Sequence, residues 1–244
     1  MDNYENFMKL LKYRRSIRKF KPDPIPEDYV TKILDAAHYA MSGGNSQPWE
    51  FIIINDPETK RKLADAYQTD YEQAWNLELM RAKPYRHPAL NAPLKDINKA
   101  LATAIDWINA PLVIAVLEDP RKQFGSVLAA FQPPVVEVLS ASMGHLSMTI
   151  HLAAASLGLG SQRVDITIQQ PFREILGYPE PLVLNTLVPI GYRAYEPGPP
   201  QRFPLEELVH TDRYDMQKYM RNEDFLKRLK RIRILGTPGY RTVG

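Results

Sequence analysis

Ser42-Gly43-Gly44-Asn45-Ser46-Gln47-Pro48-Trp49 is the stretch of the chain that decides the fold. A helical pattern ends just before it, and the run 50–54 that follows, apolar from Phe51 to Ile54, is typical of a buried strand. Two consecutive glycines permit positive φ angles and a close approach of the backbone to a flat ligand. The same residues also suit an ordinary polar turn. The stretch therefore predicts a helix–strand junction and leaves ligand binding open.

The composition limits the classes of function. The 244 residues are 44% hydrophobic and 24% charged, as in ordinary globular proteins with one sizeable core or two small ones. No cysteine is present, which excludes disulfides, thiolate metal sites and a cysteine nucleophile. No signal-peptide pattern opens the chain, and no stretch approaches the ~20 apolar residues of a membrane span. We therefore expect a cytoplasmic protein without a membrane span.

The longest helical pattern runs from Pro133-Pro134 to about Leu157 and is apolar on nearly all sides. A helix of this kind must be buried from every direction, which one small domain can hardly provide, so we infer that it crosses a subunit interface. We interpret His145 and His151 as core or interface residues, because no metal-ligand spacing pairs them with carboxylates. Other patterns predict a helix from Asp56 to about Tyr67 and strands at 112–117 and 182–189.

Three further motifs accompany the loop at 42–49, one before it in the chain and two after it. They are Arg14-Arg15-Ser16-Ile17-Arg18-Lys19-Phe20, then Ser156-Leu157-Gly158-Leu159-Gly160-Ser161, then Pro189-Ile190-Gly191-Tyr192 followed by Arg202. Together with the loop at 42–49, this ordered set resembles the FMN-dependent nitroreductase family over about residues 5–210. The resemblance implies an α+β fold with a central mixed or antiparallel sheet flanked by helices. It also implies a long buried central helix at a homodimer interface.

The resemblance assigns residues to FMN. Arginine presents a planar fork suited to phosphate and to flavin carbonyl oxygens, and the strand after Gly160 would pass the flavin and offer a backbone N–H to its N5. Ser42 and Asn45 would reach the flavin of the neighbouring subunit. The complete implied cofactor-binding set is Arg14, Arg15, Ser16, Arg18, Met41, Ser42, Gly43, Asn45, Gly160, Arg163, Val164 and Arg202.

The implied activity is an NAD(P)H-driven ping-pong hydride transfer through FMN to a flat electrophilic acceptor such as a nitroaromatic or a quinone. The chemistry would belong to FMN N5, with no catalytic side chain and no metal. Since the chain has no GxGxxG fingerprint, NADH or NADPH is expected as a transient co-substrate. Reductive dehalogenation, enone reduction, an oxidase or dehydrogenase reaction, or a flavin-binding sensor or carrier with little turnover are the alternatives. The Glu/Tyr/Lys lid set of the iodotyrosine deiodinases has no convincing counterpart here.

Two segments stand outside these motifs. Residues 68–105 mix aromatics, prolines and charges, which is typical of a lid or binding loop. Trp75, Tyr85 and Arg86 are its candidate substrate contacts, and the alternative is a helical excursion that packs on the dimer partner. Residues 213–244 carry a charge of +6 and the remainder −3. We therefore divide the chain into a domain at 1–211 and a basic extension at 212–244, which we expect to embrace the other subunit rather than bind nucleic acid or a membrane.

Overall fold

The computed structural model describes residues 2–82, 85–86, 102–122, 138–198, 202–224 and 227. Much of the predicted lid, the predicted start of the long helix at 133–137 and most of the basic extension lie outside these residues. The chain divides into two compact units, one made of Met1–Tyr71 and Thr103–Glu196 and the other of Glu72–Ala102 and Pro197–Gly244.

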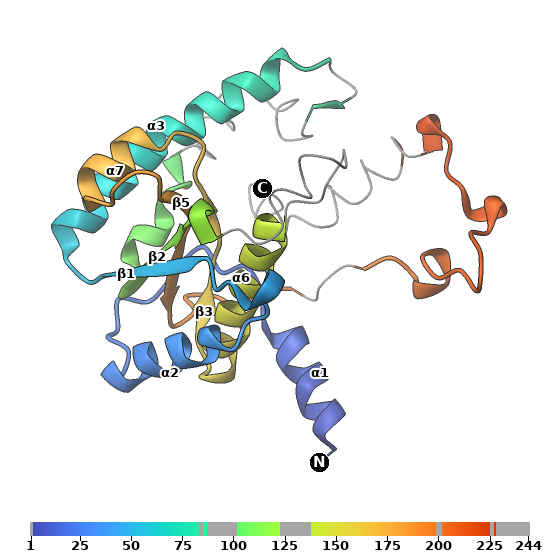
Figure 1. The fold of residues 1–244 in the computed structure, drawn as a ribbon, viewed down its shortest axis with the longest axis horizontal. Helices are drawn as coiled ribbons and strands as arrows, with labels where there is room; N and C mark the ends of the chain where they lie inside the picture. The colour runs from blue at the N-terminus through green and yellow to red at the C-terminus, as the bar shows by residue number, and fades with distance from the viewer. Residues whose placement is uncertain are drawn as a thin grey trace. The chain divides into compact units, whose positions relative to one another are not determined.

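The first unit holds the sheet and most of the helices (Figure 1). Its elements are α1 (Asn3–Tyr13), α2 (Glu27–His38), η1 (Gly43–Asn45), β1 (Trp49–Ile54), η4 (Asp106–Asn109), β2 (Leu112–Glu118), η5 (Pro120–Lys122), α6 (Val138–Ser156), β3 (Gly160–Ser161), β4 (Val164–Asp165), α7 (Gln170–Leu176) and β5 (Val183–Gly191). Helix α3 (Pro57–Met80) begins in this unit and ends in the second, which also contains η6 (Leu205–Glu207) and η7 (Met216–Lys218).

The strands form one sheet in the order β1-β2-β5-β3, with β4 also paired to β5. Every pairing between these strands is antiparallel. Strand β2 lies between β1 and β5 and contains the apolar residues 112–117, which were predicted to form a strand. The predicted α+β class is therefore observed, with helices on both faces of an antiparallel sheet (Figure 1).

Alternate residues of β2 face two separate cores, which explains why the run is apolar throughout. Val113, Ala115 and Leu117 contact residues of α3 and α7. Leu112, Ile114 and Val116 contact residues of α2 and α6 on the opposite face. Because side chains alternate along a strand, a strand covered on both faces needs apolar residues at every position.

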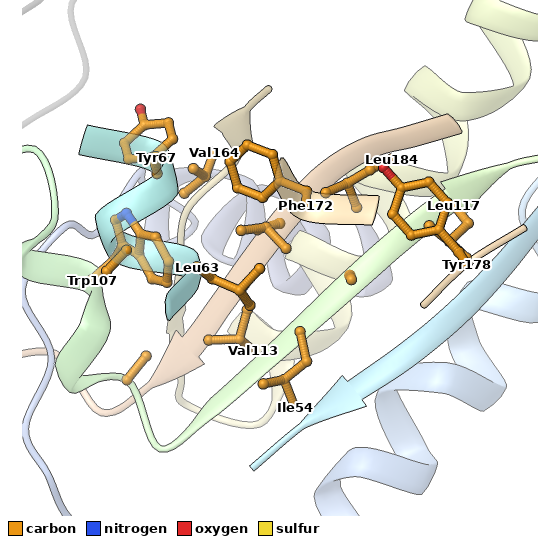
Figure 2. Close-up of a cluster of buried hydrophobic side chains, with 14 of the residues drawn as sticks. Ile54, Leu63, Tyr67, Trp107, Val113, Leu117, Val164, Phe172, Tyr178 and Leu184 are labelled. Carbon is orange, nitrogen blue, oxygen red and sulfur yellow. The ribbon is translucent and has the colours of Figure 1, made fainter. Parts of the chain in front are cut away.

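The core under α3 and α7 is built from large side chains (Figure 2). Trp107 and Phe172 are completely buried in it. Tyr67 meets Trp107 edge to face, with 6.0 Å between the ring centroids. Each large apolar side chain buried in this way stabilises the fold by about 1.5–3 kcal/mol.

Helix α3 is longer than the sequence pattern predicted. We expected it to end at about Tyr67, but it continues to Met80, so the first part of the predicted lid and Trp75 are helical. Tyr71 stacks on Tyr67 one turn earlier, at 5.6 Å between centroids, and such i,i+4 contacts stabilise a helix. The predicted end of the helix was wrong because aromatic residues at helical spacing were interpreted as lid composition. The helical residues agree with the alternative of a helical excursion, and the lid role stays a prediction.

Asp70 fixes this part of α3 to the loop before α7. Its carboxylate accepts hydrogen bonds from the backbone N–H groups of Thr167 and Ile168, each at 2.9 Å, and the residue is only 3% exposed. We expect Asp70→Ala to destabilise the protein by about 2 kcal/mol, because it leaves two N–H groups near the core without their acceptor. Urea unfolding measures this change in free energy.

The matched control is Asp65→Ala on the same helix. Asp65 is exposed and pairs with Arg61 one turn away, an arrangement worth only about 0.3–0.5 kcal/mol. Equal losses for the two variants would contradict the anchoring role of Asp70.

Candidate functional site

The basic segment 14–18 lies against strand β3. The Ile17 N–H donates to the Ser161 carbonyl at 2.9 Å, and Ser16 and Ser161 form a parallel bridge. Ile17 is completely buried, while Ser16 and Arg18 on either side of it are exposed. Alternation along an extended segment thus buries the apolar residue and directs its polar neighbours outward, where they can meet a ligand.

Gly160 allows this close approach. A Cβ atom at Gly160 would lie 2.8 Å from Ile17 Cγ1 and 2.9 Å from Ile17 Cβ. The predicted cofactor-binding glycine therefore has a packing role within the chain. Gly158, two residues earlier, has a φ of 76° where α6 ends, the left-handed conformation typical of a glycine that caps a helix C-terminus.

We expect Gly160→Ala to cost about 2 kcal/mol of stability, because an added methyl must displace Ile17 from a well-packed core. Gly144→Ala is a matched control within α6, since a Cβ there meets nothing within 4 Å. It should stabilise the helix by about 0.5–1 kcal/mol. Chemical unfolding of both variants gives the comparison, and a Gly160→Ala protein as stable as the wild type would refute the packing role.

His151 of α6 lies beside the same strand. Its Nδ1 is 2.8 Å from Ser161 Oγ, and both residues are buried. Burial, reinforced by the positive charges of Arg14 and Arg163, lowers the pKa of His151 to about 4. The interpretation of His151 as a satisfied core residue agrees with this contact. Ser161 was not predicted as its partner, because no short motif links a helix residue to a strand residue ten positions later.

Arg163 lies on the chain next to β3, and Arg18 is the last residue of the basic segment. Arg163 donates from Nε to Asp165 and from Nη2 to Asn185 at 3.3 Å, so its side chain is already partly engaged. Burial raises the pKa of the Tyr67 hydroxyl. The negative charge of Asp165 also raises this pKa, and the positive charge of Arg18 lowers it, so both side chains lie within electrostatic range of Tyr67. Val164 is completely buried, which leaves only its backbone for a ligand.

The end of α1 is held in place by Arg193. Its Nη2 donates to the Tyr13 carbonyl, and its guanidinium lies 3.6 Å from the centroid of the Tyr13 ring. The Tyr13 hydroxyl in turn donates to the Gly158 carbonyl at 2.9 Å. These contacts connect the exit of β5, the end of α6 and the residue directly before Arg14.

The glycine-containing loop at 42–49 folds over the first turn of α6. The Gly43 N–H donates to Ser142 Oγ at 3.2 Å, and a Cβ at Gly43 would lie 2.0 Å from Val138 Cγ1. Ser42 Oγ accepts from the Gln47 N–H at 3.0 Å. The loop contacts α6 at Ser142. The basic segment is joined to α6 through Ser161 and His151, and His151 lies nine residues and about 13 Å farther along the helix.

The predicted site residues therefore fall into three groups. The basic segment and β3–β4 bring together Arg14, Arg15, Ser16, Arg18, Gly160, Arg163 and Val164. The loop at the start of α6 carries Met41, Ser42, Gly43 and Asn45. The second unit contains Trp75, Tyr85, Arg86 and Arg202.

The described part of the chain contains neither a metal-binding cluster nor a membrane-spanning helix. No cluster of His, Asp or Glu side chains there could hold a metal ion. Among the same residues, every helix is too short or too polar to span a bilayer.

Comparison with known proteins identifies the family. The sequence profile described as "Nitroreductase family" matches residues 11–192. A relative named NADH dehydrogenase from Thermus thermophilus is 32% identical over 200 residues, which cover 80% of this chain and 91% of that protein. A relative named NADPH-dependent oxidoreductase from Staphylococcus saprophyticus is 28% identical over 225 residues, covering 90% of this chain and 78% of the relative.

Solved structures establish the shared fold. The NADPH:FMN oxidoreductase from Vibrio harveyi, complexed with NAD+, superposes with a TM-score of 0.63 at 19% identity and covers 93% of this chain and 86% of its own. An FMN-dependent nitroreductase from Clostridium difficile gives 0.59 at 23% identity, over 85% and 99% of the two chains. The predicted nitroreductase-like fold is confirmed, and the family match over most of the sequence shows that the chain belongs to the nitroreductase family.

Proposed function

We propose that the protein is an FMN-dependent oxidoreductase that uses NADH or NADPH to reduce a flat electrophilic acceptor such as a nitroaromatic or a quinone. The observation that carries the proposal is the basic segment 14–18, held on β3 at Ile17, with Ser16 and Arg18 exposed on either side of that residue. Relatives named NADH dehydrogenase and NADPH-dependent oxidoreductase support the use of a nicotinamide reductant.

The residues at β3 fit FMN in their chemistry. Arg14 and Arg15 supply the charge-assisted donors that a phosphate needs. Gln162, between Ser161 and Arg163, is 8% exposed, and its Oε1 has no hydrogen-bond partner within the described residues. A buried acceptor left unpaired costs about 1–3 kcal/mol. The N–H of a flavin pyrimidine ring is a donor of the kind that would satisfy it.

The chain's own residues bind and orient the cofactor. Arg14 and Arg15 hold the phosphate, and Arg18 places positive charge at the pyrimidine edge, where it favours the uptake of electrons. When bound, FMN supplies the two-electron transfer between the nicotinamide and the acceptor. No side-chain nucleophile is needed, so the protein contributes binding, orientation and a site that donor and acceptor occupy in turn.

Successive use of one site predicts ping-pong kinetics. Initial rates measured at several fixed concentrations of a nitroaromatic or quinone should give parallel double-reciprocal lines against NADH or NADPH. Intersecting lines would indicate that donor and acceptor bind together and would contradict the shared site. Binding of FMN without nicotinamide-driven turnover would favour the carrier or sensor alternative.

We also propose that the protein is a homodimer in which Ser42 and Asn45 of each copy reach the flavin of the other. Within one chain, Met148 of α6 is 45% exposed and Phe7 of α1 is 50% exposed, although both helices carry apolar faces that favour burial. The separation of about 13 Å along α6 between the loop and the basic segment also supports a site built from two copies.

Sedimentation equilibrium tests the dimer. Met148→Glu should shift the FMN-loaded protein toward monomer, while Lys32→Glu on an exposed face of α2 should not. A wild-type protein that binds FMN as a monomer at every concentration would refute the proposal.

A further inference from the structure

One buried polar contact is not explained by packing alone. His151 of α6 is 9% exposed and Ser161 of β3 is 3% exposed, yet their polar atoms lie only 2.8 Å apart. Side chains at these positions could have been apolar, since Ile150 and Ala154 on the same helix belong to the hydrophobic core. The pair therefore selects one particular placement of β3 on α6, because a hydrogen bond depends on distance and direction in a way that apolar contact does not.

The same serine also holds the basic segment. The Ser161 carbonyl accepts the Ile17 N–H at 2.9 Å, and Ser161 bridges to Ser16. Ile17 in turn packs so closely on Gly160 that no additional carbon fits between them. A displacement of Ser161 is thus transmitted to Ser16 and Ile17, and from these to the adjoining arginines.

We propose that His151, acting through Ser161, is a positioning residue for the phosphate-binding arginines Arg14 and Arg15, a role that rests on the proposed function. His151 need not touch the cofactor. It fixes the side chain of the residue whose main chain holds the arginine segment, so that the donors are preorganised when the phosphate arrives. Burial, and after it the positive charges of Arg14 and Arg163, lowers the pKa of His151 and so favours the neutral imidazole, which keeps one ring nitrogen as an acceptor.

Comparing the binding of two ligands, FMN and riboflavin, distinguishes this positioning role from a general effect on the fold. FMN and riboflavin share the ring system and the ribityl chain, and only FMN carries the phosphate. Loss of the His151–Ser161 contact should weaken binding of FMN about five- to tenfold, the effect of one net hydrogen bond. Binding of riboflavin should weaken less than binding of FMN, because riboflavin has no phosphate for Arg14 and Arg15 and would meet only Arg18 among the displaced arginines. A variant that merely loosens the fold would weaken both ligands alike.

The experiment is a double-mutant cycle in the full-length protein. The variants are His151→Leu, Ser161→Ala and their combination, with dissociation constants measured by quenching of flavin fluorescence. We expect the double variant to bind FMN no more weakly than the poorer single variant, because both changes remove the same contact. His151→Gln keeps a side chain that can hydrogen-bond to Ser161 and should restore most of the affinity. His38→Leu, at an exposed position at the end of α2, should have no effect.

Several outcomes would overturn the proposal. Additive losses for His151→Leu and Ser161→Ala would show that the two residues act independently. Equal weakening of FMN and riboflavin would assign the pair to the fold rather than to the phosphate site. If His151→Leu does not fold, Ser161→Ala and His151→Gln still decide the question. A wild-type protein that binds neither flavin would remove the proposed function itself, and this result is distinct from all the others.

Discussion

Removal of both arginines in the Arg14→Ala/Arg15→Ala variant should raise the dissociation constant for FMN by a hundredfold or more. Hydrogen bonds to charged groups contribute about 1.5–3 kcal/mol each, and every 1.4 kcal/mol changes affinity tenfold. The two losses are not expected to add fully, because both side chains would meet the same phosphate. Fluorescence titration of the FMN-free protein measures the constant directly.

The control must remove equal charge from positions next to this segment. Lys19→Ala/Lys21→Ala does so, and Lys19 already pairs with Asp106 at 3.2 Å. This variant should bind FMN within about threefold of the wild type, because Coulomb interactions of exposed charges are weak and screened by salt. Comparable losses in both double variants would indicate a diffuse positive field rather than a phosphate site at Arg14 and Arg15.

Protein stability should decrease by about 3 kcal/mol between pH 6.5 and pH 4 on account of His151. Its pKa in the folded protein is about 4, against about 6.5 in an unfolded chain. The unfolded state therefore takes up the proton first as the pH falls. The contribution of His151 is constant above about pH 6.5, decreases through this window and is constant again below pH 4, with about 1.4 kcal/mol lost per pH unit.

Other groups titrate in the same range, so the effect is measured against a variant. Urea unfolding of the wild type and of His151→Gln, both free of FMN, isolates the contribution of this residue. The difference in unfolding free energy should shift by about 3 kcal/mol in favour of His151→Gln as the pH falls to 4. A difference that stays constant with pH would show that His151 is not buried as a neutral ring.

The fold could be predicted largely because its strongest signals are local. The continuous apolar run at 112–117 has one physical explanation, a strand covered on both faces, and β2 has that environment. The proline and acids at 26–28 are typical of a helix start, and α2 begins at Glu27. The end of α3 was predicted wrongly. Its continuation to Met80 is stabilised by contacts such as Tyr67–Tyr71, and in the sequence alone the aromatic residues that make these contacts resemble the composition of a loop.

The candidate site could be predicted as a set of motifs but not as an arrangement. The motifs identified the arginine segment and the Gly160 strand separately, and the structure joins them through Ile17 and Ser161. The sequence did not indicate that His151 would hold Ser161, or that Arg193 would engage Tyr13, because both contacts connect elements brought together only by the tertiary fold. The assignments of Arg202, Trp75, Tyr85 and Arg86 stay predictions.

The most direct test of the proposed function is the visible absorption spectrum of the purified protein, recorded before and after anaerobic addition of NADH or NADPH. We expect flavin bands, or their appearance when FMN is added, that bleach with the nicotinamide and return with a nitroaromatic or a quinone. A colourless protein that takes up no FMN would contradict the assignment of the basic segment and of β3 together. If flavin bands are present but neither NADH nor NADPH bleaches them, the protein binds flavin without the proposed activity, and the proposed activity is contradicted.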